Sequence, residues 1–150
     1  MISRNRQPEW LFSAIYASPL QQNRDRLWNA LLEASKLHTL PWMRDGDFNQ
    51  IASLSEKNGG SNAGSSRRCR FQEWINNCKL IDLGFTGPFH TWSNLRPGLA
   101  RISERLDKAL ANVEWRLAYP EACVKHLPRT HSDHCPLLID LVGLAEPPRI

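Results

Sequence analysis

Two apolar stretches separated by one amphipathic segment set the strongest limit on how this chain can fold. Residues 10–19, WLFSAIYASP, are rich in aromatic and apolar side chains and end near a proline, which predicts a buried strand. Residues 23–38 place leucines on one stripe and charges opposite, which predicts an amphipathic helix. A second strand is predicted over 40–48. A strand, a helix and a strand in succession favour a layered α/β fold.

The alternation continues to the end of the chain. Residues 55–68, rich in Gly, Ser and Asn, predict a loop, and helical spacing of apolar residues predicts a helix over 69–79. Short strands are predicted at IDLGF, HTWSN, RLDKALAN, ACVKHLP and CPLLIDLV, with a brief helix at VEWRLA and a loose tail, AEPPRI. No linker divides the chain, so residues 1–150 are interpreted as a single domain.

Composition narrows the class of protein. The net charge is +4 and the pI is near 9.1, which suits a polyanionic partner and equally a soluble protein with a few extra arginines. The four cysteines form no C-x-x-C pair, which argues against a zinc ribbon or redox motif and favours free thiols in a reducing interior. No run approaches the ~18 apolar residues of a membrane span. We therefore expect no membrane association and an intracellular protein, nuclear or cytoplasmic.

The stretch DGDFNQI, residues 45–51, is the first candidate for chemistry. If the strand continues through it, Asp47 and Asn49 share one face and Phe48 points to the other. The simpler interpretation is a turn, because Gly, Asp and Asn are all turn residues.

Further polar residues fall at other predicted strand ends. They are Tyr16, the segment TWSN (91–94), Asp107 within ERLDKAL, and Asp133 and His134 within HSDHCP. Each has a simpler explanation, such as a tyrosine at the edge of the core, a surface charge, a turn residue or a structural histidine. A zinc site at HSDH lacks both the H-x-x-x-H spacing and a cysteine pair.

Taken together, these residues suit metal-assisted hydrolysis of a phosphodiester. Carboxylates bind a hard cation such as Mg²⁺, the attacking water needs a base, and the developing charge needs hydrogen-bond donors. The sequence contains no G-x-S-x-G elbow, P-loop or dinucleotide fingerprint that would favour another chemistry.

A family resemblance adds to this interpretation. The segments YASP, LPW, GDFNQI, EKNGG, FQEWINNCKLIDLGFTGP, TWSN, ISERLDKALAN, EWR and HLPRTHSDHCPLL extend through most of the chain. With GDFN, RLD and SDH in this order, the chain resembles the endonuclease/exonuclease/phosphatase superfamily, and within it the apurinic-endonuclease-like domain of plant LINE-type (non-LTR) retrotransposons. The resemblance implies a four-layer α/β sandwich that cleaves DNA.

The resemblance also implies the catalytic roles. Asp47 would orient or deprotonate the attacking water, and Asn49 would hold the scissile phosphate and Asp47. Tyr16 would donate a hydrogen bond to the phosphate. His134 would stabilise the charged phosphorane, and Asp107 would pair with His134 and fix its tautomer.

Metal and DNA contacts follow from the same resemblance. Asp133 would bind Mg²⁺, or Mn²⁺ in its place, directly or through water. Trp92 and Asn94 would lie beside the DNA strand. The segment SSRRCR, beside the flexible loop, adds predicted nucleic-acid contacts from its arginines: Arg67, Arg68 and Arg70.

The chain departs from the family pattern in two respects. The family has an N-terminal portion that supplies an early Asn and the Glu that is the main metal ligand, so this chain matches roughly the C-terminal two-thirds of such a domain. We therefore expect weak metal binding, weak or absent cleavage, and self-association through the open edge of the strand over 10–19. Arg44 and Asp45 also interrupt a strand that is apolar in the family.

Two other functions fit the sequence. One is a non-catalytic remnant that binds nucleic acid through its arginines, with Arg96 and Arg101 added to those above. The other is a phosphoesterase of the same fold that acts on a small molecule. A reverse transcriptase domain is a further expected partner in a full-length element.

Overall fold

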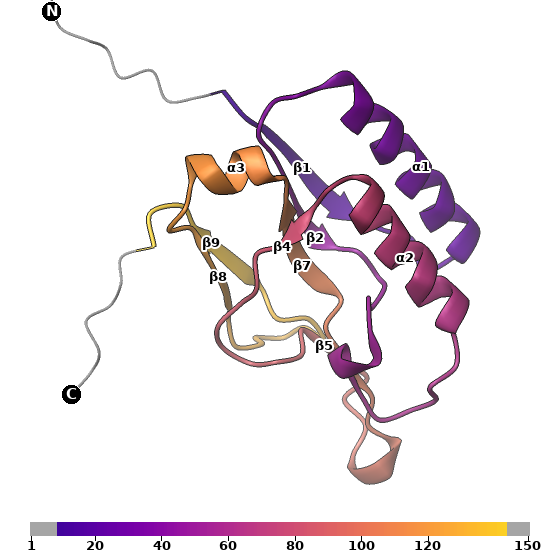
Figure 1. The fold of residues 1–150 in the computed structure, drawn as a ribbon. Helices are drawn as coiled ribbons and strands as arrows, with labels where there is room; N and C mark the ends of the chain where they lie inside the picture. Colours follow the sequence, from indigo (N-terminus) through magenta and orange to yellow (C-terminus); the bar gives the residue numbers. More distant parts are fainter. Residues whose placement is uncertain (1–8, 144–150) are drawn as a thin grey trace, which may run out of the picture.

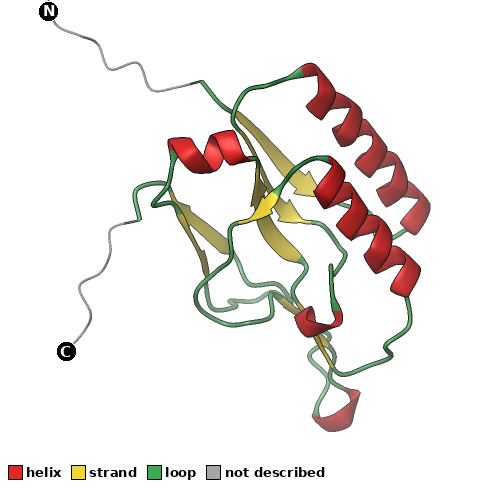
Figure 2. Cartoon of the chain, viewed as in Figure 1, coloured by secondary structure: helices red, strands yellow, loops and turns green. Residues whose placement is uncertain are grey.

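The computed structural model describes residues 9–143 of the chain. Figures 1 and 2 show a mixed arrangement of helices and strands. In chain order the elements are β1 (Leu11–Tyr16), α1 (Gln21–Leu37), β2 (Trp42–Asp47), the 3₁₀ turn Leu54–Glu56, β3 (Lys57–Asn58), α2 (Ser65–Asn77), β4 (Ile81–Asp82), β5 (Trp92–Ser93), the 3₁₀ turn Gly98–Ala100, β6 (Ser103–Glu104), β7 (Asp107–Ala111), α3 (Val113–Ala118), β8 (Cys123–His126) and β9 (Leu137–Asp140).

The largest sheet has the strand order β1-β2-β7-β4. β1 and β2 are parallel and are connected through α1, whereas β7 runs antiparallel to both of its neighbours. The register pairs Tyr16 with Asp47 and Asp47 with Asp107. Three predicted catalytic residues from distant parts of the chain therefore meet at one end of this sheet.

Each face of the sheet is covered by a different layer. α1 and α2 lie side by side on one face (Figure 1), where Trp28, Phe48, Phe71 and Trp74 form the centre of an aromatic cluster. On the other face, Trp115 of α3 and the smaller β8–β9 sheet enclose a second apolar cluster. Aromatic side chains bury a large apolar area, so these two clusters are the main source of stability.

The predicted α/β fold is confirmed, and several boundaries differ. α2 begins at Ser65, earlier than the predicted residue 69. Gly64, with a left-handed φ of +89°, is the N-cap that ends the preceding loop. The strands predicted near 81–85 and 90–94 shorten to two-residue pairings. The predicted loose tail lies outside the described residues. Among the described helices, none has the length and apolar character needed to cross a membrane.

The backbone of β2 requires glycine at position 46, between two aspartates. Its φ is +139°, and a Cβ atom at this position would collide with the carbonyl oxygen of Ile15 on β1. Only glycine fits so close to a neighbouring backbone. The close contact allows β1 and β2 to pair up to Asp47, at the end that carries the site.

The two charges that interrupt β2 point to opposite faces of the sheet. Arg44 is 1% exposed on the helical face, where its guanidinium lies 4.5 Å from the ring centre of Trp42 and 5.6 Å from that of Trp74. Its only hydrogen bond to a described residue is a long one, 3.4 Å, to the carbonyl of Leu31. Aromatic faces thus take the place of a carboxylate partner. Asp45 faces the second apolar cluster, beside Met43.

Candidate active site

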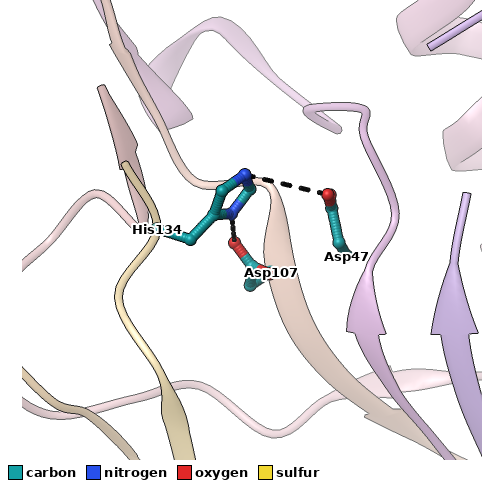
Figure 3. Close-up of side chains that lie close together, drawn as sticks. All are labelled: Asp47, Asp107 and His134. Atoms are coloured by element: carbon teal, nitrogen blue, oxygen red, sulfur yellow. Dashed lines mark hydrogen bonds and ion pairs between the residues drawn. The ribbon is translucent and has the colours of Figure 1, made fainter. Parts of the chain in front are cut away.

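Asp47, Asp107 and His134 meet at the end of the β2–β7 pair (Figure 3). Asp47 ends β2, Asp107 begins β7, and His134 lies in the loop before β9. Nδ1 of His134 lies 2.8 Å from Oδ2 of Asp107, and Nε2 lies 3.9 Å from Oδ2 of Asp47. The imidazole therefore lies between two carboxylates and contacts only one of them.

A cavity of about 650 Å³ opens over this group. Every residue predicted to be catalytic lines it, together with the predicted metal ligand Asp133 and the predicted DNA contact Trp92; the predicted catalytic residues are Tyr16, Asp47, Asn49, Asp107 and His134. The sequence spacing alone could not show this convergence, because these residues come from five separate segments of the chain.

The structure contains a turn within DGDFNQI, so Asp47 and Asn49 do not share one face of a strand. β2 ends at Asp47, so Asn49 is not on the strand, and its φ of +50° is left-handed. The backbone N–H of Asn49 donates to Oδ1 of Asp47 at 2.7 Å, which is an Asx turn. The side-chain amide of Asn49 donates to the carbonyl of Ala17. The turn thus holds the carboxylate and the amide at one wall of the cavity.

The contacts of His134 fix its orientation. An ionised Asp107 can only accept a hydrogen bond, so Nδ1 of His134 carries the hydrogen and Nε2 faces Asp47. The 3.9 Å between Nε2 and Oδ2 of Asp47 exceeds hydrogen-bond length. A single water or substrate oxygen to one side of these two atoms would be within hydrogen-bond length of both.

The protonation of Asp47 is influenced from several sides. Burial, and then the charge of Asp107, raise the pKa of Asp47 above its usual value. The N–H of Asn49 and the charges of His134 and Lys108 act in the opposite direction. A carboxylate with a raised pKa is a stronger base, so this environment suits proton abstraction.

Asp45 offers a pH test of the same electrostatics. Burial, and then the charge of Asp107, raise the pKa of Asp45 to about 6, so its carboxyl group holds a proton more tightly in the folded than in the unfolded chain. Its contribution to stability is fully present below about 3.8 and is lost as pH rises through about 6. We expect Asp45→Asn to raise the free energy of unfolding at pH 7.5 by about 1 kcal/mol, after allowance for solvent screening, and to change it little at pH 4. Urea denaturation at both values checks this; equal gains would contradict it.

Asp133 is held at the rim of the cavity. Its carboxylate accepts a hydrogen bond from Nε1 of Trp92 at 3.2 Å, and its carbonyl accepts one from the N–H of Ser93. The donor set is compatible with a hard cation, because the carboxylates of Asp47, Asp107 and Asp133 face one cavity. The ligand atoms that lie within 4.8 Å of one another belong to Asp47, Asp107 and His134, and Asp133 is not in that group.

The other predicted residues lie in varied positions. Tyr16 is 87% exposed at the cavity wall. The side chain of Asn94 is engaged within the hairpin of β5 and β6. It accepts from the N–H groups of Arg96 and Ile102 and donates to the carbonyl of Ala100. The arginines of α2 separate: Arg67 and Arg68 line a neighbouring cavity, whereas Arg70 pairs with Asp25 of α1 at 3.2 Å.

Thr91 was missed by the sequence reasoning. It is fully buried, and its hydroxyl oxygen lies 3.0 Å from the backbone N–H groups of both Leu106 and Asp107. It therefore fixes the start of β7, where Asp107 is located. A threonine beside a tryptophan in TWSN gave no signal beyond strand propensity.

A buried ionic network beneath the cavity was also missed. Arg105 contacts Asp82 at 2.6 and 2.8 Å and Glu56 at 3.1 Å, and the ammonium of Lys108 lies 3.2 Å from Glu56. Lys108 also donates to the carbonyl of Gln50. These contacts connect the loop after Asn49 to the residues on either side of Asp107, so the network holds the segments of Asp47 and Asp107 together.

Comparison with solved structures identifies the fold of the chain. No family model matches the sequence, and no curated protein matches it either. The endonuclease domain of TRAS1, a telomere-specific non-LTR retrotransposon, superposes with a TM-score of 0.56 at 18% identity over 85% of this chain. A beta toxin structure from Staphylococcus aureus gives a TM-score of 0.46 at 14% identity, covering 82% of this chain and 42% of the toxin. The chain spans 54% of the TRAS1 domain structure and has the α/β fold of that endonuclease domain.

Proposed function

We propose that the cavity is the active site of a metal-dependent phosphodiesterase that acts on DNA. The observation that carries the proposal is the gap between Asp47 and Nε2 of His134, with Asp107 bound to the opposite nitrogen of the imidazole. A base and an oriented imidazole that both reach one oxygen atom supply the proton acceptor and a hydrogen-bond donor for hydrolysis of a phosphodiester.

Each residue then has a chemical role. Asp47 accepts a proton from the attacking water as the water oxygen bonds to phosphorus. The ester P–O bond then breaks, and the leaving oxygen takes a proton from solvent. Asp107 keeps the imidazole of His134 oriented, and His134 donates a hydrogen bond to the charge that develops on the phosphoryl oxygens. Tyr16 and Asn49 bind the scissile phosphate, because both line the cavity and carry donors.

Mg²⁺ is the cation that the carboxylates favour, with Mn²⁺ as a substitute. Asp133 would hold it, and it would supply positive charge to the phosphate and its leaving oxygen. Affinity is expected to be weak, because Asp133 lies outside the closest group of ligand atoms.

DNA is the proposed substrate for two reasons. The structural neighbour with the higher TM-score is the endonuclease domain of a retrotransposon. The chain also carries a net charge of +4, and cationic side chains gather beside the active-site cavity.

Nicking of supercoiled plasmid tests the proposal. We expect the purified chain to convert plasmid slowly to nicked circles in millimolar Mg²⁺ or Mn²⁺, EDTA to stop the reaction, and Asp47→Asn to remove it. Asp47→Asn keeps the acceptor for the Asn49 N–H but not the base, so it is also the control for contaminating nucleases. Salt-sensitive DNA binding without nicking would favour a non-catalytic binder. Hydrolysis of small phosphoesters alone would favour a small-molecule enzyme.

A further inference from the structure

A second cavity, of about 220 Å³, opens directly beside the active-site cavity. The two share wall residues, among them Pro19, Asn49 and Glu104. A DNA strand with one phosphate in the active-site cavity would thus have its neighbouring phosphate within reach of the second cavity.

The two cavities differ sharply in charge. The active-site cavity is lined by Asp47, Asp107 and Asp133, which favour a cation there, so a phosphate would bind in it together with the metal. The second cavity is lined by Arg24, Lys57, Arg67 and Arg68. Among the described residues its one acidic wall residue is Glu104, which lies 3.6 Å from the ammonium of Lys57. We call this second cavity, with Arg24, Lys57 and Arg67 in its wall, the basic pocket. An anion in the basic pocket would reduce the mutual repulsion of its cations.

Arg24 provides a fixed charge in the basic pocket. It is 3% exposed, and its terminal nitrogens donate to the carbonyls of Ser18 and Pro19 and to the side chains of Gln21 and Gln50. None of these acceptors is a carboxylate, and its Nε has no partner among the described residues. Burial, and then the charge of Arg67, lower the pKa of Arg24, which is the direction that crowding by cations produces.

Arg67 has the donors that remain free to bind a ligand. Its guanidinium lies over Gly64, where an added Cβ would be 2.7 Å from Nη2, and no hydrogen bond joins it to residues 9–143. Arg68, in contrast, donates to the carbonyls of Ala63 and Asn62, and Lys57 donates to the carbonyl of Ser61. Arg67 is therefore placed to contact an anion directly, while its neighbours shape the loop.

We propose that the basic pocket binds the phosphate next to the scissile one, with Arg67 as its direct ligand, so that the site selects a polynucleotide over an isolated phosphoester. This inference rests on the proposed function, because it takes the neighbouring cavity to be the active site. It assigns Arg67 to substrate recognition, with Arg24 as a fixed positive charge beside it, and it separates Arg67 from Arg70.

The matched pair Arg67→Gln and Arg70→Gln tests the pocket by binding. Both arginines are exposed on α2, but Arg70 pairs with Asp25 away from the two cavities. We expect fluorescence anisotropy with a labelled duplex in EDTA to show about tenfold weaker binding for Arg67→Gln and a salt slope lower by about 0.9. Arg70→Gln should bind like the wild type. Equal effects of the two variants would overturn the proposal.

A second measurement separates this inference from the proposed function. Bis(p-nitrophenyl) phosphate is a diester without a neighbouring phosphate, so Arg67→Gln should lose more activity on plasmid than on this substrate, and the ratio of the two rates should fall. An equal loss on both substrates would place Arg67 at the scissile phosphate and overturn the pocket. If the wild type hydrolyses neither substrate, the proposed function fails, and the anisotropy result alone decides whether the basic pocket binds a phosphate.

Discussion

His134→Ala is expected to slow hydrolysis by about 10²–10⁴-fold, the range for removal of a positioned acid or base, and Asp107→Ala by about ten- to a hundredfold. The double variant should be no slower than His134→Ala. The reason is the 2.8 Å contact between Nδ1 of His134 and Asp107, through which Asp107 acts by orienting the imidazole. Without the imidazole, the carboxylate has nothing to position. Initial rates with bis(p-nitrophenyl) phosphate and plasmid nicking both measure this.

His131→Asn provides the matched control. His131 precedes the site by three residues, is exposed, and has a φ of +54°, which asparagine tolerates. Its replacement removes a histidine from the same loop without touching the cavity, so activity should be retained. If the losses from Asp107→Ala and His134→Ala multiply in the double variant, the two residues act independently and the pairing is not catalytic.

Glu56→Ala is expected to lower the free energy of unfolding by about 3–5 kcal/mol. Glu56 contacts both Arg105 and Lys108, whose side chains are 8% and 1% exposed. Its other oxygen accepts the backbone N–H of Ala52 at 2.7 Å. Removal of the carboxylate leaves the buried charge of Lys108 without an ionic partner, which costs far more than a lost surface contact.

Glu33→Ala is the comparison for this experiment. Glu33 pairs with Lys36 at 2.9 Å, but both side chains are mostly exposed, and such pairs contribute about 0.5 kcal/mol or less. Urea unfolding followed by circular dichroism gives both values. A loss for Glu56→Ala as small as that for Glu33→Ala would mean that water or rearranged neighbours compensate for Glu56, and the network would not hold the site in place.

Much of the fold could be predicted from local pattern. The helix at 23–38 follows from its leucine stripe, and the brief helix VEWRLA is found at Val113–Ala118, where Asn112 caps it by accepting the N–H of Trp115. The short strands were predicted to be longer than they are, because the propensity of one segment cannot show where its neighbouring strand ends. The register that pairs Asp47 with Asp107 depends on contacts distant in sequence.

The site divides in the same way. Residue types that carry chemistry, such as Asp47 and His134, stand out in a sequence. Residues that hold them, such as Thr91 and Lys108, have no distinctive pattern and are recognised only by their partners. The arginines Arg67 and Arg70 look equivalent in SSRRCR, and only the position of Asp25 on α1 separates them.

The direct pairing of Asp47 with Asp107 has a consequence for folding kinetics. Like charges opposite one another weaken a strand ladder, so the β2–β7 ladder should close first at the Met43–Ala111 end and last at the aspartates. Closing such a non-local pair is slow, because chain entropy is lost before the contacts form. Secondary structure and core burial should thus recover earlier than function during refolding, and local opening of the native protein should begin at the aspartate end of the ladder.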